Sequence, residues 1–412
     1  MTKVAVFESA DASALPDLLD AAADWCELVV VNAGPQPWSA EERDGLADLA
    51  EVVDAAGSDP ATIAAELAAL DVDGVLTVED EWIPLVAAVA ARLGLPYHDE
   101  AAAEAVTRKD VQRAILAGTG LGVRAAAFTD ETGLVAAIAA VGFPAVLKPV
   151  RGNGSFNIFP VDDETALRAA LAAASRTAGP DAQTWLLEER LIGVPHPEGD
   201  WLGDHFSVEM ATLGEGEHWA FWLSDRFPLL PPLRDSGMTG PSLLPWETQQ
   251  LAVERAAQIL TALGVTSGLA HMEFKQTATG PRLIEVNGRL GGFLSSIVPR
   301  VSTLNPVRLA LEVAVGKAER RPVVTTGYAA CLFTQSPLSA RRITALADPA
   351  ELLRVPGVWR VDPRRAVGDQ TDYRTGLHGR LQNVWIEGTT AAEFRDAWAA
   401  ASAFIAEGNR FE

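Results

Sequence analysis

The sequence predicts an α/β protein that begins with a parallel sheet and continues into mixed α+β subdomains. Short apolar runs at residues 4–7, 28–31 and 74–78 alternate with stretches of helical spacing. Strands that alternate with helices form a parallel sheet with helices on its faces. Farther along, HMEFKQTATGPRLIEVN reads as two strands joined by a tight turn, which is typical of an antiparallel hairpin.

The helices expected in the N-terminal part cover residues 60–70 and 82–93. The first opens with Asp59 and Pro60, an acidic cap followed by a proline at the first helical position. The turn after the first strand, ESADASA, contains no glycine, so the dinucleotide-binding fingerprint is absent. We therefore expect a Rossmann-like domain that does not bind NAD.

The middle of the chain predicts a helix followed by a glycine-containing loop between two strands. Residues 101–117 have helical spacing and carry Lys109. In GFPAVLKPVRGNGSFNIF, we expect a strand at 145–148, a glycine loop at 151–155 and a second strand at 156–159. The further expected elements are helices at 165–174, 247–263 and 391–406, strands at 184–188, 205–212 and 269–275, and an irregular insertion at 194–204.

Composition limits the possible functions. At 412 residues the chain is long enough for two to four domains. Its 33 Lys and Arg against 55 Asp and Glu give a net charge of −22, which argues against a nucleic-acid or anionic-membrane partner. Cys26 and Cys331 support neither a disulfide framework nor a cysteine metal site, and the start lacks a signal peptide. With no apolar run long enough to span a membrane, we expect a cytoplasmic protein.

Three polar residues alternate along the last strand of the hairpin. Glu285, Asn287 and Arg289 are spaced two apart, so a strand would place them on one face, just before a Gly–Gly pair. Such a face is solvated in many proteins, and the pattern alone does not decide between a solvated face and a site.

The partner strand supplies a second carboxylate. Antiparallel pairing is expected to bring Glu273 within roughly 5 Å of the strand that carries Glu285 and Asn287. Two carboxylates that close repel each other unless a cation lies between them, and oxygen-only ligands suit Mg²⁺. The alternative is a surface pair neutralised by Lys275 or Arg282.

The glycine loop in KPVRGNGSFNI is a candidate phosphate site. Gly152 and Gly154 expose backbone N–H groups, and Lys148 adds a positive charge at the end of the preceding strand. The Walker pattern is absent, because no Gly-Lys-Ser/Thr follows. By itself the loop could equally be an ordinary turn.

Taken in order, these motifs resemble a known superfamily. Helical Lys109, the strand with Lys148 and its glycine loop, EERLIG at 188–193, HFSVE, and EF…LIEVNGRLGG follow one another as in the ATP-grasp carboxylate–amine ligases. The resemblance covers roughly residues 1–320 and is greatest to the L-amino-acid ligase branch that forms dipeptides. It implies an N-terminal Rossmann-like domain (1–100), an ATP-grasp small subdomain with the glycine loop (101–190), an ATP-grasp large subdomain with the metal site (191–320) and a C-terminal α+β lid (321–412).

The resemblance also implies roles for individual residues. ATP and Mg²⁺ are the expected cofactors, with two metal ions and with Mn²⁺ as an alternative metal. His205 departs from the family pattern, which places an acidic ribose ligand there, and Asp204 is the alternative. His271 is either a substrate contact or a structural histidine. The implied sites are ATP phosphates at Lys109 and Lys148; a flap at Gly152, Asn153, Gly154 and Ser155; an adenine hinge at Glu188, Glu189 and Leu191; ribose at His205; metal at Glu273, Glu285 and Asn287; and substrate at His271, Arg289, Gly291 and Gly292, with Arg289 catalytic.

The function implied is an ADP-forming ligase that activates a carboxylate as an acyl phosphate and joins it to an amine. The expected partners are an amino acid or another small carboxylate and an amine, with a homodimer left open. Two alternatives remain at this point. One is an ATP-grasp ligase or carboxylase for a carboxylate other than an amino acid's, and the other is a catalytically silent ATP-binding regulator.

Overall fold

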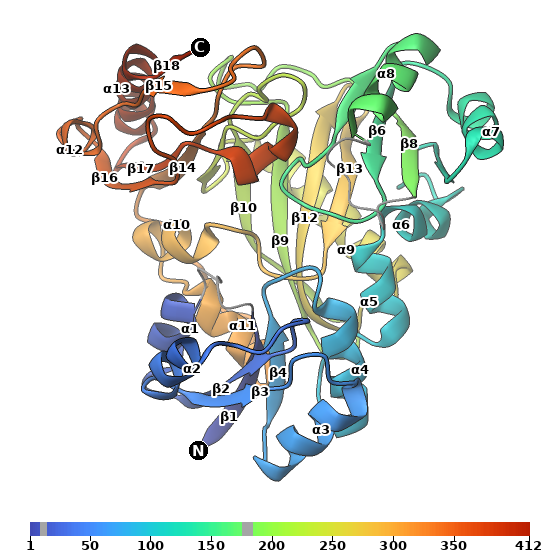
Figure 1. Cartoon of the computed structure of the whole chain (residues 1–412), viewed down its shortest axis with the longest axis vertical. Helices are drawn as coiled ribbons and strands as arrows, with labels where there is room; N and C mark the ends of the chain where they lie inside the picture. Colours follow the sequence, from blue (N-terminus) through green and yellow to red (C-terminus); the bar gives the residue numbers. More distant parts are fainter. Residues whose placement is uncertain (9–14, 175–183) are drawn as a thin grey trace.

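The computed structural model describes residues 1–8, 15–174 and 184–412. A parallel sheet at the N-terminus, a long antiparallel sheet through the middle of the molecule and a small antiparallel sheet beside it form its framework (Figure 1). The α/β class with a mixed second part is therefore confirmed. Within the described ranges, no helix combines the length and the apolar character needed to cross a membrane.

The N-terminal sheet is parallel throughout, with strand order β3-β2-β1-β4. All the strands and helices expected here are present, whereas β3, α1 and α2 were not predicted. The glycine-free turn after β1 falls largely on residues 9–14, outside the described part. The elements are β1 (Thr2–Phe7), α1 (Leu15–Ala22), β2 (Cys26–Asn32), α2 (Ala40–Ala47), β3 (Glu51–Asp54), α3 (Pro60–Ala69), β4 (Gly74–Thr77) and α4 (Ile83–Leu93).

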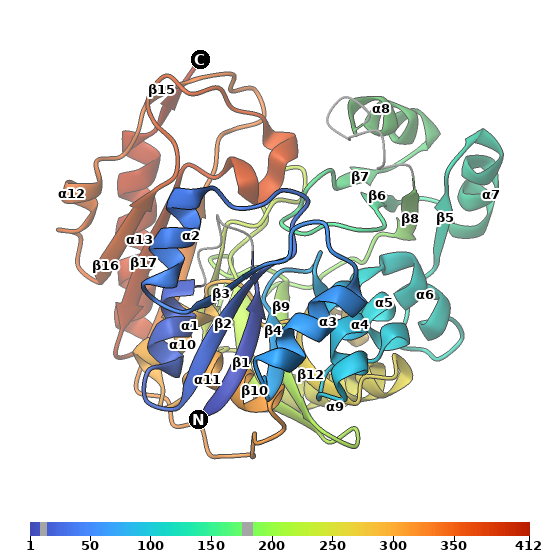
Figure 2. The ribbon, with the colours of Figure 1, turned by 60° about the horizontal axis from the view of Figure 1, so that its bottom comes forward.

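Each face of this sheet packs against its own helices, because successive strand residues point to opposite sides. Ala5 and Phe7 of β1 pack with α3 and α4. Val4 and Val6 pack with α1 and with α11 (Pro306–Ala314), which comes from much later in the chain. Figure 2 shows the two helix pairs on the two sides of the sheet. Since α11 follows the central hairpin, this packing fixes the N-terminal sheet against the part that carries the predicted site.

Glu8, directly after β1, provides a test of this core. Its side chain is 2% exposed, and its Oε1 has no hydrogen-bond partner among the residues that the structure describes. Burial, together with the nearby Glu79, raises the pKa of Glu8 from 4.5 to about 8. Between these values the unfolded chain is ionised at this position while the folded chain stays protonated, so stability should fall as the pH rises from about 4.5 to about 8.

The Glu8→Gln variant should lose this slope and be more stable than the wild type at about pH 8, by roughly 2 kcal/mol or more. Urea unfolding at about pH 5, 6.5 and 8 measures the difference. Glu27→Gln, on an exposed side chain of β2, is the control and should follow the wild-type curve. Parallel curves for the wild type and Glu8→Gln would mean that Glu8 is not held protonated.

The small sheet is antiparallel, with strand order β5-β8-β6-β7. The strand expected at 156–159 is wrong, because β7 begins only at Phe159. Ser155 and Asn157 have φ of 60° and 52°, left-handed values that a strand does not accommodate. The glycine loop therefore extends through Asn157. The elements are β5 (Ala125–Phe128), α7 (Glu131–Val141), β6 (Ala145–Pro149), β7 (Phe159–Val161), α8 (Glu164–Ala174) and β8 (Trp185–Glu189).

The single helix expected at 101–117 is also wrong. The chain forms α5 (Glu100–Thr107) and α6 (Lys109–Leu116), and Arg108 between them has φ −122° and ψ 113°, outside the helical region. The Lys109 N–H donates to the carbonyl oxygen of Val150 at 3.0 Å instead of to the preceding helical turn. This tertiary bond breaks the helix and places Lys109 at the start of α6, beside the glycine loop.

The central sheet has eight strands in the order β13-β12-β9-β10-β11-β14-β17-β16, and all neighbours pair antiparallel. The hairpin predicted from HMEFKQTATGPRLIEVN is β12–β13. Three strands from beyond residue 321 continue the same sheet, so the C-terminal part is built onto the sheet that carries the hairpin. The strands are β9 (His205–Leu213), β10 (His218–Arg226), β11 (Gly237–Gly240), β12 (Ser267–Thr277), β13 (Gly280–Asn287), β14 (Tyr328–Thr334), β16 (Val358–Pro363) and β17 (Gln382–Gly388).

The remaining elements cover this sheet, and a C-terminal segment reaches the glycine loop. The Leu377 N–H donates to the carbonyl oxygen of Gly154 at 2.8 Å, and the Asn157 N–H to that of Arg374 at 3.3 Å. The C-terminal part, coloured orange to red, therefore touches the loop of the small sheet (Figure 2). The remaining elements are α9 (Trp246–Ala262), α10 (Leu294–Val301), β15 (Ile343–Ala345), α12 (Pro349–Leu352), the 3₁₀ segment η1 (Tyr373–Gly379), α13 (Ala391–Gly408) and β18 (Arg410–Phe411).

Candidate active site

One cavity of about 1190 Å³ is lined by the N-terminal sheet's β4–α4 connection, the glycine loop, the central hairpin and the C-terminal strands. It brings together every predicted site residue except Lys109, which lies just behind its wall. The predicted residues that line it are Lys148, Gly152, Asn153, Gly154, Ser155, Glu188, Glu189, Leu191, His205, His271, Glu273, Glu285, Asn287, Arg289, Gly291 and Gly292.

The two hairpin carboxylates lie opposite each other. Glu273 of β12 pairs with Glu285 of β13 in the strand register, and His271 pairs with Asn287. The Asn287 amide Nδ2 donates to Glu285 Oε1 at 3.3 Å. Both carboxylates and the amide are thus directed to the same side of the hairpin and into the cavity.

Lys109 connects this carboxylate pair to the glycine loop. Its Nζ donates to the carbonyl oxygen of Gly152 at 2.6 Å and lies 3.3 Å from Glu285 Oε2. The side chain is almost fully buried, so its charge acts through a medium with little screening by water. One lysine therefore sets the distance between the loop and the hairpin.

Glu188 forms a buried ionic triad with two cations. Its Oε1 accepts from Lys148 Nζ at 3.0 Å and its Oε2 from Arg113 Nε at 2.5 Å. Burial alone would raise the pKa of Glu188, but Arg113 and Lys148 hold it below its ordinary value. Burial lowers the pKa of Lys148, and Glu188 opposes that shift. The carboxylate of Glu188 is thus committed to orienting Lys148, while Glu189 and Leu191 continue along the cavity wall.

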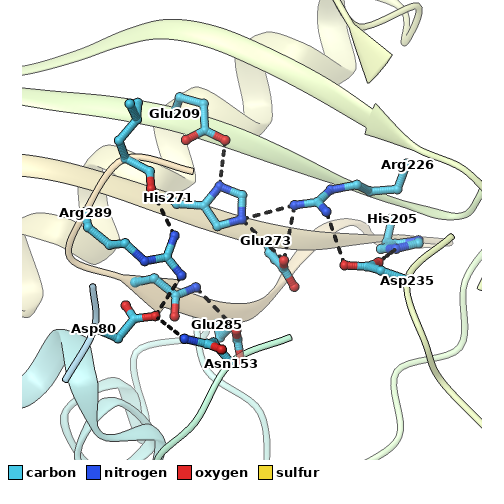
Figure 3. A network of polar contacts seen from close by, with 12 residues as sticks. Asp80, Asn153, His205, Glu209, Arg226, Asp235, His271, Glu273, Glu285 and Arg289 are labelled. Atoms are coloured by element: carbon cyan, nitrogen blue, oxygen red, sulfur yellow. Dashed lines mark hydrogen bonds and ion pairs between the residues drawn. The ribbon is translucent and has the colours of Figure 1, made fainter. Parts of the chain in front are cut away.

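Arg289 lies beyond the end of β13, so its expected place on the strand face with Glu285 and Asn287 is wrong. The strand ends at Asn287, whose carbonyl accepts from the Arg289 N–H at 2.9 Å in a tight turn. The side chain instead reaches the N-terminal domain, where Nη2 donates to Asp80 Oδ2 at 2.7 Å. The same Asp80 oxygen accepts from Asn153 Nδ2 at 3.0 Å (Figure 3). Asp80 thus joins the glycine loop to the turn after the hairpin.

His271 belongs to a buried polar chain along the sheet (Figure 3). Its Nδ1 lies 2.6 Å from Glu209 Oε1, and its Nε2 lies 3.1 Å from Arg226 Nη2. Burial alone would lower the pKa of His271, but Glu209 and then Glu273 raise it to about 9. A Cβ on Gly291 would come within 2.7 Å of His271 Nδ1, so only glycine fits beside this pair. The carboxylates of Glu209 and Glu273 therefore favour the charged form of His271, and the nearby Arg226 opposes it.

The two candidates for ribose contact have different neighbours. His205 lines the cavity, and its Nε2 lies 3.2 Å from Asp235 Oδ1. Asp204 instead pairs with Lys275 at 2.6 Å. That pair leaves His205, supported by Asp235, as the residue at the cavity wall.

The sequence analysis missed several residues of the site. Asp80 follows β4 within the acidic run Glu79–Glu81, and a carboxyl end of a parallel strand is a common place for site residues, so this signal was readable. Arg226 at the end of β10 donates to Asp235 and to Glu273, both at 3.2 Å, but nothing in its local sequence indicates this.

The residues at the hairpin fit Mg²⁺ bound together with phosphate. Glu273, Glu285 and Asn287 offer only oxygen donors, and Mg²⁺ is held in proteins by one or two carboxylates plus phosphate oxygens and water. In the described part of the chain, no three or more His, Cys, Asp or Glu side chains group to hold a metal by themselves. The donor set therefore suits a metal that arrives with its phosphate ligand and does not suit a resident structural ion.

Family models match two parts of the chain. Residues 26–97 match the ATP-grasp N-terminal domain, and residues 141–297 match the ATP-grasp domain. The chain belongs to the ATP-grasp superfamily.

Known relatives and structures agree with this family. The crystal structure of L-amino acid ligase from Bacillus licheniformis superposes with a TM-score of 0.78 at 18% identity, covering 100% of this chain and 99% of that one. Carnosine synthase 1 of Homo sapiens is 26% identical over 322 residues, which are 71% of this chain and 37% of the relative. D-alanine–D-alanine ligase of Kineococcus radiotolerans is 31% identical over 207 residues, 47% of this chain and 54% of the relative. This chain spans only 17% to 44% of the lengths of the first four curated relatives that it matches.

Proposed function

We propose that the protein is an ADP-forming, ATP- and Mg²⁺-dependent ligase that joins the carboxylate of an amino acid to an amine, giving an amide or dipeptide. The observation that carries this proposal is the opposition of Glu273 and Glu285 across the hairpin, with Lys109 bridging Glu285 to the glycine loop in one cavity. This arrangement has the charges that a nucleoside triphosphate and its metal need in one place. ATP supplies the phosphoryl group that turns a poor leaving group into a good one.

The nucleotide side is assigned to the glycine loop and the two lysines. Gly152 has φ 122° and Gly154 has φ 63°, positive values that glycine adopts without the strain of a side chain. Lys148 is oriented by Glu188, and Lys109 by the Gly152 carbonyl. We assign both ammonium groups to the phosphates, and Glu189 and Leu191 to the base.

The metal side is assigned to Glu273, Glu285 and Asn287. These three residues would hold Mg²⁺, and Glu285 would divide its charge between the metal and Lys109, whose Nζ lies 3.3 Å from Glu285 Oε2. Burial alone would raise the pKa of Glu273, but the hydrogen bond with His271 and the charge of Arg226 hold it below its ordinary value, against the opposing charge of Asp235. An ionised Glu273 is the form that binds a cation.

Arg289 is assigned to the reacting carboxylate. Its guanidinium is fixed by Asp80 and by the carbonyl of Leu290 at 2.9 Å, and it lines the cavity just past Asn287. A planar guanidinium can hold a carboxylate or phosphate through two parallel bonds. The activated acyl group would have to be kept from water, which would hydrolyse it before the amine attacks.

The names of the relatives support the amino-acid part of the proposal, since two of them are ligases named for amino acids. A matrix of amino acids, single and paired, incubated with ATP and Mg²⁺ tests it. ADP release that depends on a pair, with a product whose mass equals the pair minus water, is expected. A catalytically silent regulator would release no ADP with any pair.

Arg289→Lys should keep ATP affinity and lose turnover by about a hundredfold, because an ammonium cannot reproduce the two parallel bonds. Calorimetry with an ATP analogue and steady-state turnover on the same variant measure the two quantities. Arg282→Lys, on the β13 strand that precedes Arg289, is the control; the Arg282 guanidinium donates to the Gly122 carbonyl at 2.7 Å. Full activity of Arg289→Lys would remove Arg289 from the site, and lost ATP binding would move it to the nucleotide.

A further inference from the structure

The wall of the cavity that the C-terminal part supplies is basic, although the chain as a whole carries a net charge of −22. Arg360, Arg364 and Arg380 all line this wall. Arg360 is neutralised by Asp362 at 2.6 Å. In the described ranges, Arg364 and Arg380 have no carboxylate within ion-pair distance. Two positive charges therefore face the cavity without an internal counter-charge.

Arg380 is held in place by neutral groups. Its Nε donates to Asn383 Oδ1 at 2.9 Å, and its Nη1 donates to the Leu377 carbonyl at 2.7 Å. The guanidinium also lies 5.7 Å from the ring centroid of Phe293. These contacts orient the group but leave its charge uncompensated, and they use only part of its five N–H donors.

The protein keeps this charge at an energetic cost. Burial and the neighbouring Arg364 both lower the pKa of Arg380, which means that the folded chain disfavours its charged form relative to water. Like charges brought together without an acid are stabilised by an anionic ligand. This arrangement is that of an anion site and not of a structural ion pair.

Arg380 contacts one neighbour of the glycine loop and one neighbour of the turn that carries Arg289. Leu377, whose carbonyl it contacts, donates its N–H to Gly154 of the glycine loop at 2.8 Å. Phe293, whose ring it faces, follows Arg289 by one short turn, and its φ of 65° gives the left-handed backbone that ends that turn. An anion on Arg380 would therefore sit beside the nucleotide loop and the reacting carboxylate at once.

We propose that Arg380, with Arg364 beside it, binds the carboxylate of the amine-bearing substrate. This inference rests on the proposed ligase function. The carboxylate that is activated already has Arg289 and the metal site, so a second uncompensated guanidinium serves a second anionic group. An acceptor amino acid brings such a group, because its own carboxylate is not consumed. The acceptor is then an amino acid, or another amine that carries a carboxylate, and the product is a dipeptide-like acid.

The test compares an acceptor amino acid with its neutral amide in the wild type and in Arg380→Gln. The wild type should prefer the free acid in kcat/KM by about tenfold to a hundredfold, the usual range for one charge-assisted contact. Arg380→Gln should lose that preference through a higher KM for the free acid, with the KM for ATP and the rate with the amide unchanged. Arg365→Gln is the matched control, since Arg365 donates to the His378 carbonyl at 3.1 Å and does not line the cavity.

Several outcomes would overturn the inference. The wild type could use the free acid and the amide with equal kcat/KM, or Arg380→Gln could keep the wild-type preference for the free acid. A third such outcome is an Arg380→Gln variant whose only change is weaker inhibition by inorganic phosphate, which would assign the site to the phosphate product. If Arg380→Gln does not fold, the same comparison is made with Arg364→Gln, a change of an exposed side chain. A partial loss of the preference for the free acid is expected, and an unchanged preference would contradict the proposal. No ADP release with either acceptor in the wild type would instead refute the ligase function itself.

Discussion

The Glu285→Gln variant should lose turnover by at least about a hundredfold while its fold stays intact. The change removes one metal-binding charge and almost no volume. The amide keeps one acceptor oxygen, which can serve Lys109 or Asn287 but not both, because the two contact different oxygens of Glu285. The melting temperature without ligand should therefore fall modestly and by less than in Glu188→Ala, since Lys109 keeps its bond to the Gly152 carbonyl. Steady-state ADP release, measured across a range of Mg²⁺ concentrations, checks the prediction.

Partial recovery of Glu285→Gln at high Mg²⁺ is expected, because the variant lowers metal affinity and leaves the other ligands in place. Glu254→Gln, an exposed change on α9, is the matched control and should behave as the wild type. Wild-type turnover of Glu285→Gln at ordinary Mg²⁺ would show that the hairpin carboxylate does not bind the metal.

The Glu188→Ala variant should show the largest loss of stability, on the order of 3–5 kcal/mol. It leaves Arg113 and Lys148, both at most 4% exposed, next to each other with no carboxylate between them. Breaking a buried pair by removing one partner costs far more than the pair contributes, because a buried charge is left uncompensated. The midpoint of chemical denaturation, with the same probe for all variants, measures the loss.

The neighbouring residue gives a matched control for Glu188. Glu189 pairs with Arg124 at 2.8 Å, but the Arg124 side chain is 67% exposed, so Glu189→Ala should cost about 1 kcal/mol or less. Equal losses in Glu188→Ala and Glu189→Ala would mean that the triad does not stabilise the fold. ATP affinity should also fall in Glu188→Ala, because Lys148 loses the carboxylate that orients it. Glu189→Ala is the control for stability only, since Glu189 is itself assigned to the base.

Local sequence patterns predicted those parts of the structure that depend on residues close together in the chain. Alternation along the two hairpin strands placed Glu273 and Glu285 face to face, and the register of β12 and β13 has them as partners. The alternating apolar runs likewise gave the parallel sheet. Both are consequences of the two-residue period of a strand, which is visible in a single sequence.

Tertiary contacts determine the features that local sequence patterns did not predict. The break at Arg108 depends on a bond from Lys109 to Val150, and a helical pattern carries no trace of it. The partner of Arg289 is Asp80, more than two hundred residues earlier, and tertiary packing such as that of α11 against the N-terminal sheet brings the two together. No local sequence pattern predicts a contact between residues so far apart in the chain.

The proposed ligase function requires that a carboxylate is activated by phosphorylation in the cavity. A donor amino acid whose carboxylate oxygens are ¹⁸O-labelled tests this directly, with mass spectrometry of the phosphate and of the nucleotide after turnover with an acceptor. We expect ADP, amide product in equal amount, and one labelled oxygen in the inorganic phosphate, because the oxygen that links the acyl group to phosphorus leaves with the phosphate. Label recovered in AMP, or ADP release with unlabelled phosphate and no amide, would contradict that function.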